Sequence, residues 1–342
     1  MADEIPRKPR TFQAARRKGS TPVEESGESW ELGPIIAGLK ESREVAHNIR
    51  HGRVARRLPS RAALAEIING LSAALFPTHY GQPNLHDDSI DEFVRTTLGS
   101  ALSELVEQIR LSLPLGSSDT APDFRATDRV AHDIAHELAL QLPAIRAILA
   151  SDLRAAYEGD PSAASMPEIL LGYPGMVAII CYRLARALHL LGAPLIARLM
   201  TLVAHSRTGI DIHPGAEIGP SFFIDHGTGV VIGETAIIGT GVRLCQAVTL
   251  GANRSLPGGR GLAIKGIARH PILEDDVFIH AGATLLGRIT IGRGSTIGGN
   301  VWLTTSVPPG SNVSQPLLGG LAARRPRGDA EAAERDRNAA RQ

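Results

Sequence analysis

The residues from Ile212 to about Val313 repeat with a period of six, and this period constrains the fold more than any other feature of the sequence. Aliphatic residues occupy one place in successive units: Ile212, Ile218, Ile224, Ile232, Ile238, Leu244, Leu250, Leu273, Ile279, Leu285, Ile291, Ile297 and Leu303. Neither the 3.6-residue period of a helix nor the two-residue period of an ordinary strand fits this pattern. It is typical of a left-handed parallel β-helix, in which three six-residue units close one triangular coil.

The aliphatic residue of each unit should point inward and stack on its equivalents, where each contributes about 1.5–3 kcal/mol if fully buried. Two departures interrupt the period. The chain gains two residues between Ile224 and Ile232, and residues 252–268 form a longer insertion. Phe222 and Arg254 occupy places that small residues otherwise fill, so we expect the coils there to be distorted or covered.

The rest of the chain has helical or irregular patterns, which predicts an α+β protein with an α-helical domain before the β-helix. The expected organisation is a flexible basic tail at 1–29, a helical domain at 30–208, the β-helix at 209–315 with a loop at 252–271, and a second flexible tail at 316–342. Expected helices cover residues 61–75, 91–113, 128–158 with an interruption at Pro143, 167–191 and 194–205, with a linker at 114–123.

Composition excludes several classes of partner. The net charge of +1 gives no overall electrostatic reason to bind nucleic acid or a membrane. Cys181 and Cys245 are not spaced as a metal or disulfide pair, which favours a reducing, cytoplasmic compartment. The most apolar stretch, residues 169–180, is broken by glycine and proline, so no membrane-spanning segment is expected.

Polar residues within the repeat gather at three places: residues 211–214 (Asp-Ile-His-Pro), 224–229 (Ile-Asp-His-Gly-Thr-Gly) and 269–271 (Arg-His-Pro). Histidine and aspartate have no role in an aliphatic core, so these side chains should lie on outward faces or at interfaces. A histidine held by a carboxylate is the arrangement of a general base. Asp211 and His226 are separated by slightly less than one coil, which is compatible with side chains on neighbouring turns.

These motifs resemble those of the serine O-acetyltransferases, a family of hexapeptide-repeat acyltransferases. The matching segments are residues 209–214, 225–229, 233–235, 249–251 and 269–271, with 157–161 and 173–183 upstream. The resemblance covers about residues 140–315. It implies direct transfer of acetyl from acetyl-CoA to the L-serine hydroxyl, which gives O-acetyl-L-serine for cysteine biosynthesis.

The resemblance also implies roles for single residues. His226 matches the general base that takes the proton of the serine hydroxyl, and Asp211 matches the carboxylate that orients it. His270 matches a second histidine that contacts the serine. The sites of this family are shared between subunits of a trimer, so Asp211 and His226 would face His270 of the neighbouring subunit. His213, His205 and His280 are better explained as structural residues.

Residues that recognise the two substrates follow from the same match. Asp160 and Asp225 match acidic residues around the ammonium and hydroxyl of serine, and Arg269 matches the partner of its carboxylate. The coenzyme should contact residues that are mostly small: Gly251, Ala252, Lys265, Ala281, Gly282 and Gly299. Backbone N–H groups near Gly251 are candidates for stabilising the oxyanion. The Lys265 ammonium suits a coenzyme A phosphate, but a solvated loop charge explains it equally well.

The expected partners are L-serine, acetyl-CoA, L-cysteine as a feedback inhibitor competitive with serine, and further copies of the chain in a homotrimer or a dimer of trimers. Many members of the family end in a terminal isoleucine that inserts into the thiol-lyase that makes cysteine. This chain ends with residues 338–342 (Asn-Ala-Ala-Arg-Gln), so no tight complex through its tail is expected. Neither a metal, nor nucleic acid, nor a membrane is an expected partner.

Three alternatives remain open. A hexapeptide acyltransferase for another small amino acid or a sugar hydroxyl would not need to recognise both ends of serine. A γ-type carbonic anhydrase would need a histidine pair five residues apart on one repeat, whereas His270 and His280 are ten residues apart. The last alternative is a scaffold without activity. His132 and His136 lie one turn apart on a predicted helix, but a solvated helix face explains them better than a zinc site.

Overall fold

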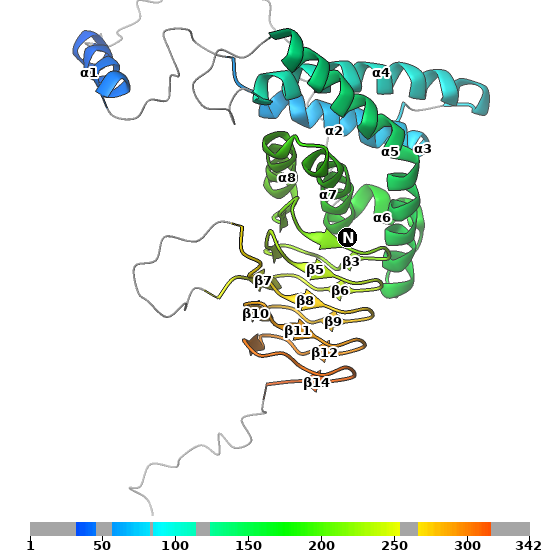
Figure 1. Cartoon of the computed structure of the whole chain (residues 1–342). Coiled ribbons are helices and arrows are strands. Elements are labelled where there is room, and N and C mark those ends of the chain that lie inside the picture. The colour runs from blue at the N-terminus through cyan, green and yellow to red at the C-terminus, as the bar shows by residue number, and fades with distance from the viewer. Residues whose placement is uncertain (1–31, 46–56, 83–84, 114–123, 254–265, 316–342) are drawn as a thin grey trace, which may run out of the picture. The chain divides into compact units, whose positions relative to one another are not determined.

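The structure is a computed structural model, and it describes residues 32–45, 57–82, 85–113, 124–253 and 266–315. The chain divides into two units, Met1–Arg56 and Arg57–Gln342. In the first unit, helix α1 (Leu32–Val45) is exposed along residues 32–42. The helices and strands described in the following paragraphs all belong to the second unit (Figure 1). The expected tails, the linker at 114–123 and Arg254 lie outside the described residues.

The helices of the second unit are α2 (Arg61–Leu75), α3 (Pro77–Tyr80), α4 (Asp87–Ser112), α5 (Phe124–Gly159), α6 (Met166–Gly172), α7 (Pro174–Leu190) and α8 (Pro194–Thr208). The prediction for residues 61–75 is confirmed, and the Ser60 side chain caps this helix by accepting from the Ala63 N–H at 3.3 Å. Such a cap satisfies one of the unpaired N–H groups at the helix start.

Two helix predictions were wrong, both at prolines. Helix α5 continues through Pro143, because its apolar stripe, which includes Leu142 and Ile145, is buried on both sides of the proline and stabilises the helix there. The predicted helix at 167–191 is two helices, α6 and α7, with an extended Tyr173 between them (φ −86°, ψ 118°). Tyr173 precedes Pro174, and a residue in that position is disfavoured in the helical region.

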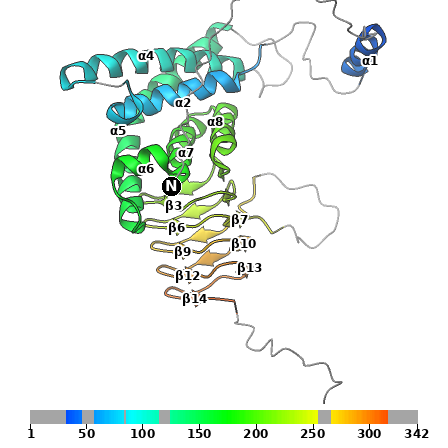
Figure 2. The ribbon, with the colours of Figure 1, turned by 180° about the vertical axis from the view of Figure 1, so that it is seen from behind.

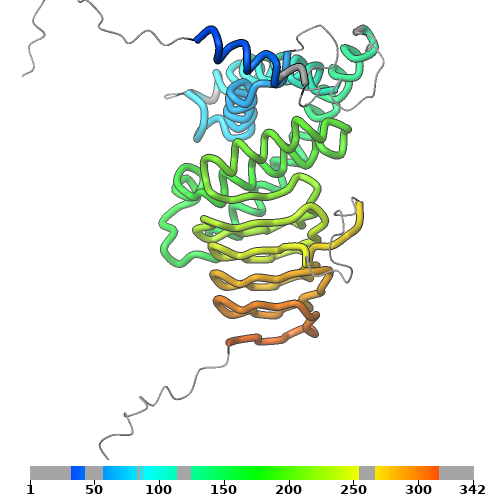
Figure 3. Tube along the Cα trace, turned by 90° about the vertical axis from the view of Figure 1, so that its left-hand side faces the viewer, coloured from blue at the N-terminus to red at the C-terminus, as the bar shows by residue number. Residues whose placement is uncertain are grey.

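The repeat region folds as three parallel sheets, which confirms the predicted β-helix (Figure 3). Sheet A has the strand order β1-β4-β7-β10-β13, sheet B β11-β8-β5-β2, and sheet C β14-β12-β9-β6-β3. The strands are β1 (Asp211–Ile212), β2 (Glu217–Ile218), β3 (Phe223–Ile224), β4 (Val231–Ile232), β5 (Ile237–Ile238), β6 (Arg243–Leu244), β7 (Thr249–Gly251), β8 (Ile272–Leu273), β9 (Phe278–Ile279), β10 (Thr284–Leu286), β11 (Thr290–Ile291), β12 (Thr296–Ile297), β13 (Trp302–Leu303) and β14 (Asn312–Val313).

Each strand sends its aliphatic residue into the coil and the preceding residue outward. In sheet A, Ile212 pairs with Ile232 and Ile232 with Leu250, and all three side chains are buried. Their outward neighbours Asp211 and Val231 pair with each other on the outer face. Since every coil repeats this register, an outward residue on one coil lies beside its equivalent on the next.

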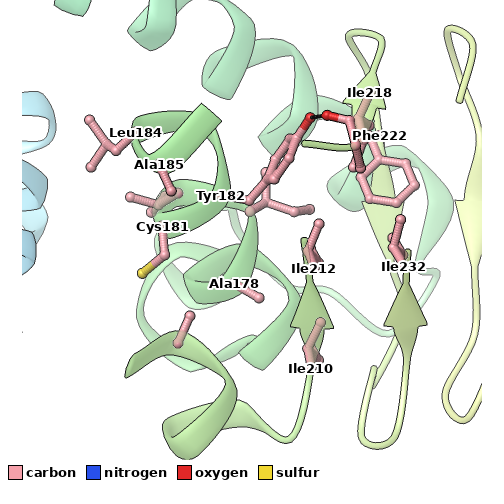
Figure 4. Close-up of a cluster of buried hydrophobic side chains, with 14 of the residues drawn as sticks. Ala178, Cys181, Tyr182, Leu184, Ala185, Ile210, Ile212, Ile218, Phe222 and Ile232 are labelled. Atoms are coloured by element: carbon pink, nitrogen blue, oxygen red, sulfur yellow. Dashed lines mark hydrogen bonds between the residues drawn. The ribbon is translucent and has the colours of Figure 1, made fainter. Parts of the chain in front are cut away.

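The helical part closes the N-terminal end of the β-helix, because α5 and α7 pack on β3 and α8 packs on β1. Phe222, which occupies a small-residue place, is fully buried near Tyr182, Ile212 and Ile232 (Figure 4). Its N–H donates to the buried carboxylate of Asp152 at 2.9 Å. The expectation that the coil at Phe222 is covered is therefore confirmed.

A buried ion pair joins the two parts of this unit. Arg183 of α7 donates to both oxygens of Asp152 of α5, at 3.0 and 3.1 Å. It also donates to the carbonyls of Ile218 and Gly219 on the first coil. Breaking such a pair from one side leaves a buried charge without a partner, which costs about 3–5 kcal/mol.

Among the helices that the structure describes, no single one is long and apolar enough to cross a membrane. Helices α6 and α7 meet the criterion only when taken together, and the chain bends by 75° between them.

Candidate active site

The two residues gained between Ile224 and Ile232 enlarge the corner that joins sheet C to sheet A, and this corner carries His226. The corner keeps its place in the stack, because the Gly229 N–H donates to Gly209 O and the Ala247 N–H donates to Thr228 O, each at 2.9 Å. His226 has φ 57° and Gly227 has φ 89°, so both adopt left-handed conformations. The His226 side chain is 78% exposed. The extra residues thus project an imidazole outward without disturbing the core.

Asp225, directly before His226, forms an ion pair with Arg243. The Arg243 Nη2 donates to the Asp225 Oδ2 at 2.5 Å, and the Asp225 side chain is 15% exposed. The remaining oxygen, Oδ1, lies 3.8 Å from Nε2 of His226. This distance is too long for a hydrogen bond but short enough for electrostatic attraction to a protonated imidazole.

Asp211 begins β1 beside the same corner, since Gly209 O receives the hydrogen bond from Gly229. Its carboxylate accepts hydrogen bonds from Arg198 of α8 at 2.9 and 3.4 Å. The interactions of the described residues include none between Asp211 and His226. The predicted pairing of these two side chains therefore stays a prediction.

His270 lies at the corner between sheets A and B, before β8, and only 7% of it is exposed. The backbone N–H of Thr235 donates to its Nδ1 at 3.1 Å. A backbone N–H can only donate, so Nδ1 accepts and the neutral ring carries its proton on Nε2. Burial, followed by the charge of neighbouring Arg269, lowers the pKa of His270. The ring is therefore suited to donate from Nε2 as a neutral imidazole.

Asp160 follows the end of α5 and is an ionised carboxylate. Its oxygens accept from the Tyr173 hydroxyl at 2.6 Å and from the hydroxyl and N–H of Ser162 at 2.7 and 2.9 Å. The hydrogen bond from Tyr173, followed by those from Ser162, lowers the pKa of Asp160 to about 2. Arg243 brings this segment toward Asp225, because its Nη1 donates to the carbonyl of Gly159 at 2.5 Å.

One chain does not bring all predicted site residues together. Asp160, Asp225 and His226 surround the end of sheet C, whereas Arg269 and His270 lie at the corner between sheets A and B. The described coenzyme residues also divide between two edges of sheet A: Gly251 ends β7, whereas Ala281, Gly282 and Gly299 precede β10 and β13. Ala252 follows Gly251, and Lys265 lies outside the described residues.

A cavity of about 370 Å³ lies between the end of α5 and sheet C. Arg154, Glu158, Phe223 and Arg243 are among the residues that line it, but Asp225 and His226 are not. We therefore do not assign it as the serine site. Among the residues that the structure describes, no group of three or more His, Cys, Asp or Glu side chains is placed to hold a metal ion.

Sequence reasoning assigned no role to Arg243 or to Thr235, which bonds the ring of His270 through its N–H. The sequence does contain a sign that Arg243 is unusual, because it directly precedes the inward Leu244, a place that Phe223 and Phe278 occupy in the equivalent units of the coils before and after it. Thr235 has no such sign, since its contact with His270 joins residues 35 positions apart.

Known proteins are similar to this chain in sequence and in fold. A family model described as bacterial transferase hexapeptide (six repeats) matches residues 270–305. A serine acetyltransferase of Synechococcus elongatus, described as plasmid-borne, is 51% identical over 294 residues, which cover 84% of this chain and 91% of the relative. The chain belongs to the serine acetyltransferase family. It is therefore an acyltransferase that acetylates serine, and the predicted fold class, enzyme class and function are confirmed. Serine acetyltransferases use acetyl-CoA as co-substrate.

Other serine acetyltransferases match in sequence or in structure. The Bacillus licheniformis enzyme is 45% identical over 166 residues, which cover 48% of this chain and 73% of the relative. The structure of Entamoeba histolytica serine acetyltransferase isoform 3 in complex with cysteine superposes with a TM-score of 0.64 at 30% identity, covering 88% of this chain and 96% of the other. The structure of serine acetyltransferase 1 from the same organism with L-cysteine also has a TM-score of 0.64, at 32% identity, covering 82% and 97%.

Proposed function

We propose that this serine acetyltransferase transfers acetyl directly from acetyl-CoA to L-serine, with His226 as the general base. The observation that carries the proposal is the enlarged corner, which projects His226 outward beside the carboxylate of Asp225. A serine hydroxyl is a weak nucleophile at neutral pH and needs a general base to take its proton, and an outward imidazole can fill that role.

In the proposed reaction, neutral His226 takes the hydroxyl proton while the serine oxygen attacks the thioester carbon. The tetrahedral oxyanion collapses by breaking the carbon–sulfur bond, and imidazolium returns the proton to the departing coenzyme A sulfur. Backbone N–H groups at Gly251 and Ala252 are the proposed donors to the oxyanion. Asp211 is proposed to orient His226; its second oxygen is bonded to Arg198 only at 3.4 Å and retains accepting capacity.

We assign recognition of the amino acid to both ends of the molecule. Asp160 and Asp225 receive the ammonium and hydroxyl, supported by the low pKa of Asp160 and the ion pair of Asp225. Arg269 receives the carboxylate, and the Nε2–H of His270 donates to the substrate. L-Cysteine fits the same contacts, and two related structures contain it. We therefore propose cysteine as an inhibitor that competes with serine.

The proposed site needs a second copy of the chain. His226 and His270 stand at different corners of one β-helix, so a neighbouring subunit must bring its Arg269 and His270 to the His226 corner. A homotrimer, alone or as a dimer of trimers, satisfies this requirement through threefold symmetry. The coenzyme residues fit the same arrangement, with Gly251, Ala252 and Lys265 from one subunit and Ala281, Gly282 and Gly299 from the next.

We also place the enzyme in the cytoplasm. Cys181 and Cys245 are both free and buried, which suits a reducing compartment.

The proposal is tested with acetyl-CoA and a panel of L-serine, homoserine, threonine and sugars, by measuring release of the free thiol. The highest kcat/KM is expected for L-serine, and His226→Ala should abolish most of it. His205→Ala is the matched control, because His205 is exposed on α8 and is assigned no role in catalysis or binding. A sugar or another amino acid with a higher kcat/KM would contradict the assignment of Asp160, Asp225 and Arg269.

A further inference from the structure

Arg243 stands in the outward place of β6, and the neighbouring coils put an aromatic ring on each side of it. It pairs with Phe223 of β3 in one direction and with Phe278 of β9 in the other, and Figure 2 shows these strands in succession. The guanidinium carbon lies 5.1 Å from the centre of the Phe223 ring and 4.9 Å from that of Phe278. Both distances allow cation–π attraction, so the two rings hold the guanidinium between them.

The same guanidinium bonds two groups that are distant in sequence. Nη1 donates to the carbonyl of Gly159, 84 residues away, and Nη2 donates to Oδ2 of Asp225, each at 2.5 Å. Arg243 therefore ties the residue directly before Asp160 to the residue directly before His226. The Arg243 side chain is 29% exposed and that of Asp225 is 15% exposed, so their attraction is screened less than that of a surface pair.

The contact with Arg243 also distinguishes the two oxygens of Asp225. Oδ2 accepts from Arg243, whereas Oδ1 is the oxygen 3.8 Å from Nε2 of His226. The guanidinium is itself held between two rings, so its hydrogen bond to Oδ2 favours the orientation of the carboxylate that turns Oδ1 toward His226. The oxygen that faces the histidine is thereby kept in place.

We propose that Arg243 is a positioning residue for serine, which holds Asp225 and the segment of Asp160 in the arrangement that receives the substrate. This inference rests on the function proposed above for those two carboxylates. Two carboxylates that surround one ammonium repel each other before the substrate binds. A guanidinium bonded to one of them, and to the residue before the other, offsets part of that repulsion. Because Arg243 acts through Asp225 and through the segment of Asp160, its loss weakens serine binding and leaves acetyl-CoA binding unchanged.

The test measures KM for each substrate in Arg243→Met, Arg243→Lys, Asp225→Asn and the double variant Arg243→Met with Asp225→Asn. Arg243→Met should raise KM for L-serine about 10- to 100-fold, the effect of losing a hydrogen bond to a charged group. KM for acetyl-CoA should stay within about twofold. The raised KM of the double variant should be smaller than the product of the two single effects, since neighbours that act as one unit are not additive; the bond from Arg243 to Gly159 remains in Asp225→Asn and is lost only when Arg243 is replaced. Arg243→Lys should fall between the wild type and Arg243→Met, because lysine keeps the charge but not the planar fork.

Arg293→Met is the matched control. Arg293 bonds Asp275 at 2.7 Å on the same β-helix, so its variant also loses an ion pair but should leave both KM values unchanged. If Arg243→Met does not fold, Arg243→Lys alone carries the test. An unchanged KM for serine, or additive effects in the double variant, would overturn the proposal for Arg243 alone. An unchanged KM in Asp225→Asn would overturn it together with the role of Asp225.

Discussion

Gly227 permits the corner that presents His226, and replacing it with alanine tests that geometry. Gly227 has φ 89°, and an added Cβ would lie 2.4 Å from Cδ1 of Ile210 and 2.8 Å from Cγ2 of Ile224. Both isoleucines are buried, so neither can move away freely. The left-handed conformation costs a non-glycine residue about 1–2 kcal/mol. Overpacking a filled core adds about 1–3 kcal/mol, which gives a total of about 2–5 kcal/mol.

Gly294→Ala separates these two contributions. Gly294 also has a left-handed conformation, with φ 67°, but no atom lies within 4 Å of its added Cβ. Urea unfolding at one fixed protein concentration should show a larger loss of stability for Gly227→Ala than for Gly294→Ala, which carries only the backbone cost. Equal losses in the two variants would refute the argument that the isoleucines confine this corner.

Activity gives a second measurement of the same change. Because both isoleucines are confined by burial, the clash at Gly227 should push the corner outward and displace His226 from the reacting hydroxyl. A displacement of about 1 Å at a catalytic group reduces turnover about 100-fold. Gly227→Ala should therefore lose kcat, whereas Gly294→Ala should keep it. Full turnover in a stable Gly227→Ala protein would show that His226 needs no such support.

Three further predictions follow from the site. His226→Ala should reduce turnover by about 10²–10⁴, the usual contribution of a general base, and near-normal turnover with intact assembly would contradict its role. Cysteine should raise the apparent KM for serine, and a fall in maximal rate alone would place cysteine elsewhere. Burial lowers the pKa of His270, so neutral His270 contributes its full stability to the fold above about pH 6.5, and this contribution is lost on acidification. The urea midpoint should therefore fall less between pH 7.5 and pH 5 in His270→Asn than in the wild type.

The expectation that residues 330–342 mediate no tight complex with the thiol-lyase also stays a prediction. Residues 330–342 lie outside the described part of the chain, so the tail is tested in solution. Co-elution of the two enzymes that disappears on deletion of these residues would contradict it.

The features of the fold that depend on the spacing of nearby residues could be predicted from the sequence. The period of six identifies the inward residues, because each strand alternates in and out and each coil repeats the last. Ile212 and Ile232 are paired in register even though twenty residues separate them, since the two extra residues are accommodated at a corner. The helices at prolines were less predictable. Pro143 stays within α5 because buried neighbours outweigh its lost hydrogen bond, whereas Pro174 separates two helices.

Contacts between segments that are distant along the chain could not be predicted from the sequence. Arg198 donates to Asp211, the carboxylate that was expected to orient His226. Arg198 thus competes with His226 for this carboxylate, and its position follows only from the packing of α8 against β1. The contact of Arg243 with Gly159 depends on where α5 ends relative to sheet C. Neither contact has a signature in residue spacing, because both join a helix to a coil rather than one coil to the next.

The site residues occupy places that the β-helix core does not need. Asp225 follows the inward Ile224, His226 lies in the enlarged corner, and Arg243 stands in an outward place. Because the inward residues stay in register on both sides of the corner, the extra residues add a projecting imidazole without shifting the stack of inward side chains. The spacing between coils, about 4.8 Å, then lets outward residues of successive coils touch. A repeat that stacks Phe223, Arg243 and Phe278 can therefore hold a carboxylate beside a histidine with side chains that point away from the inside of the coil.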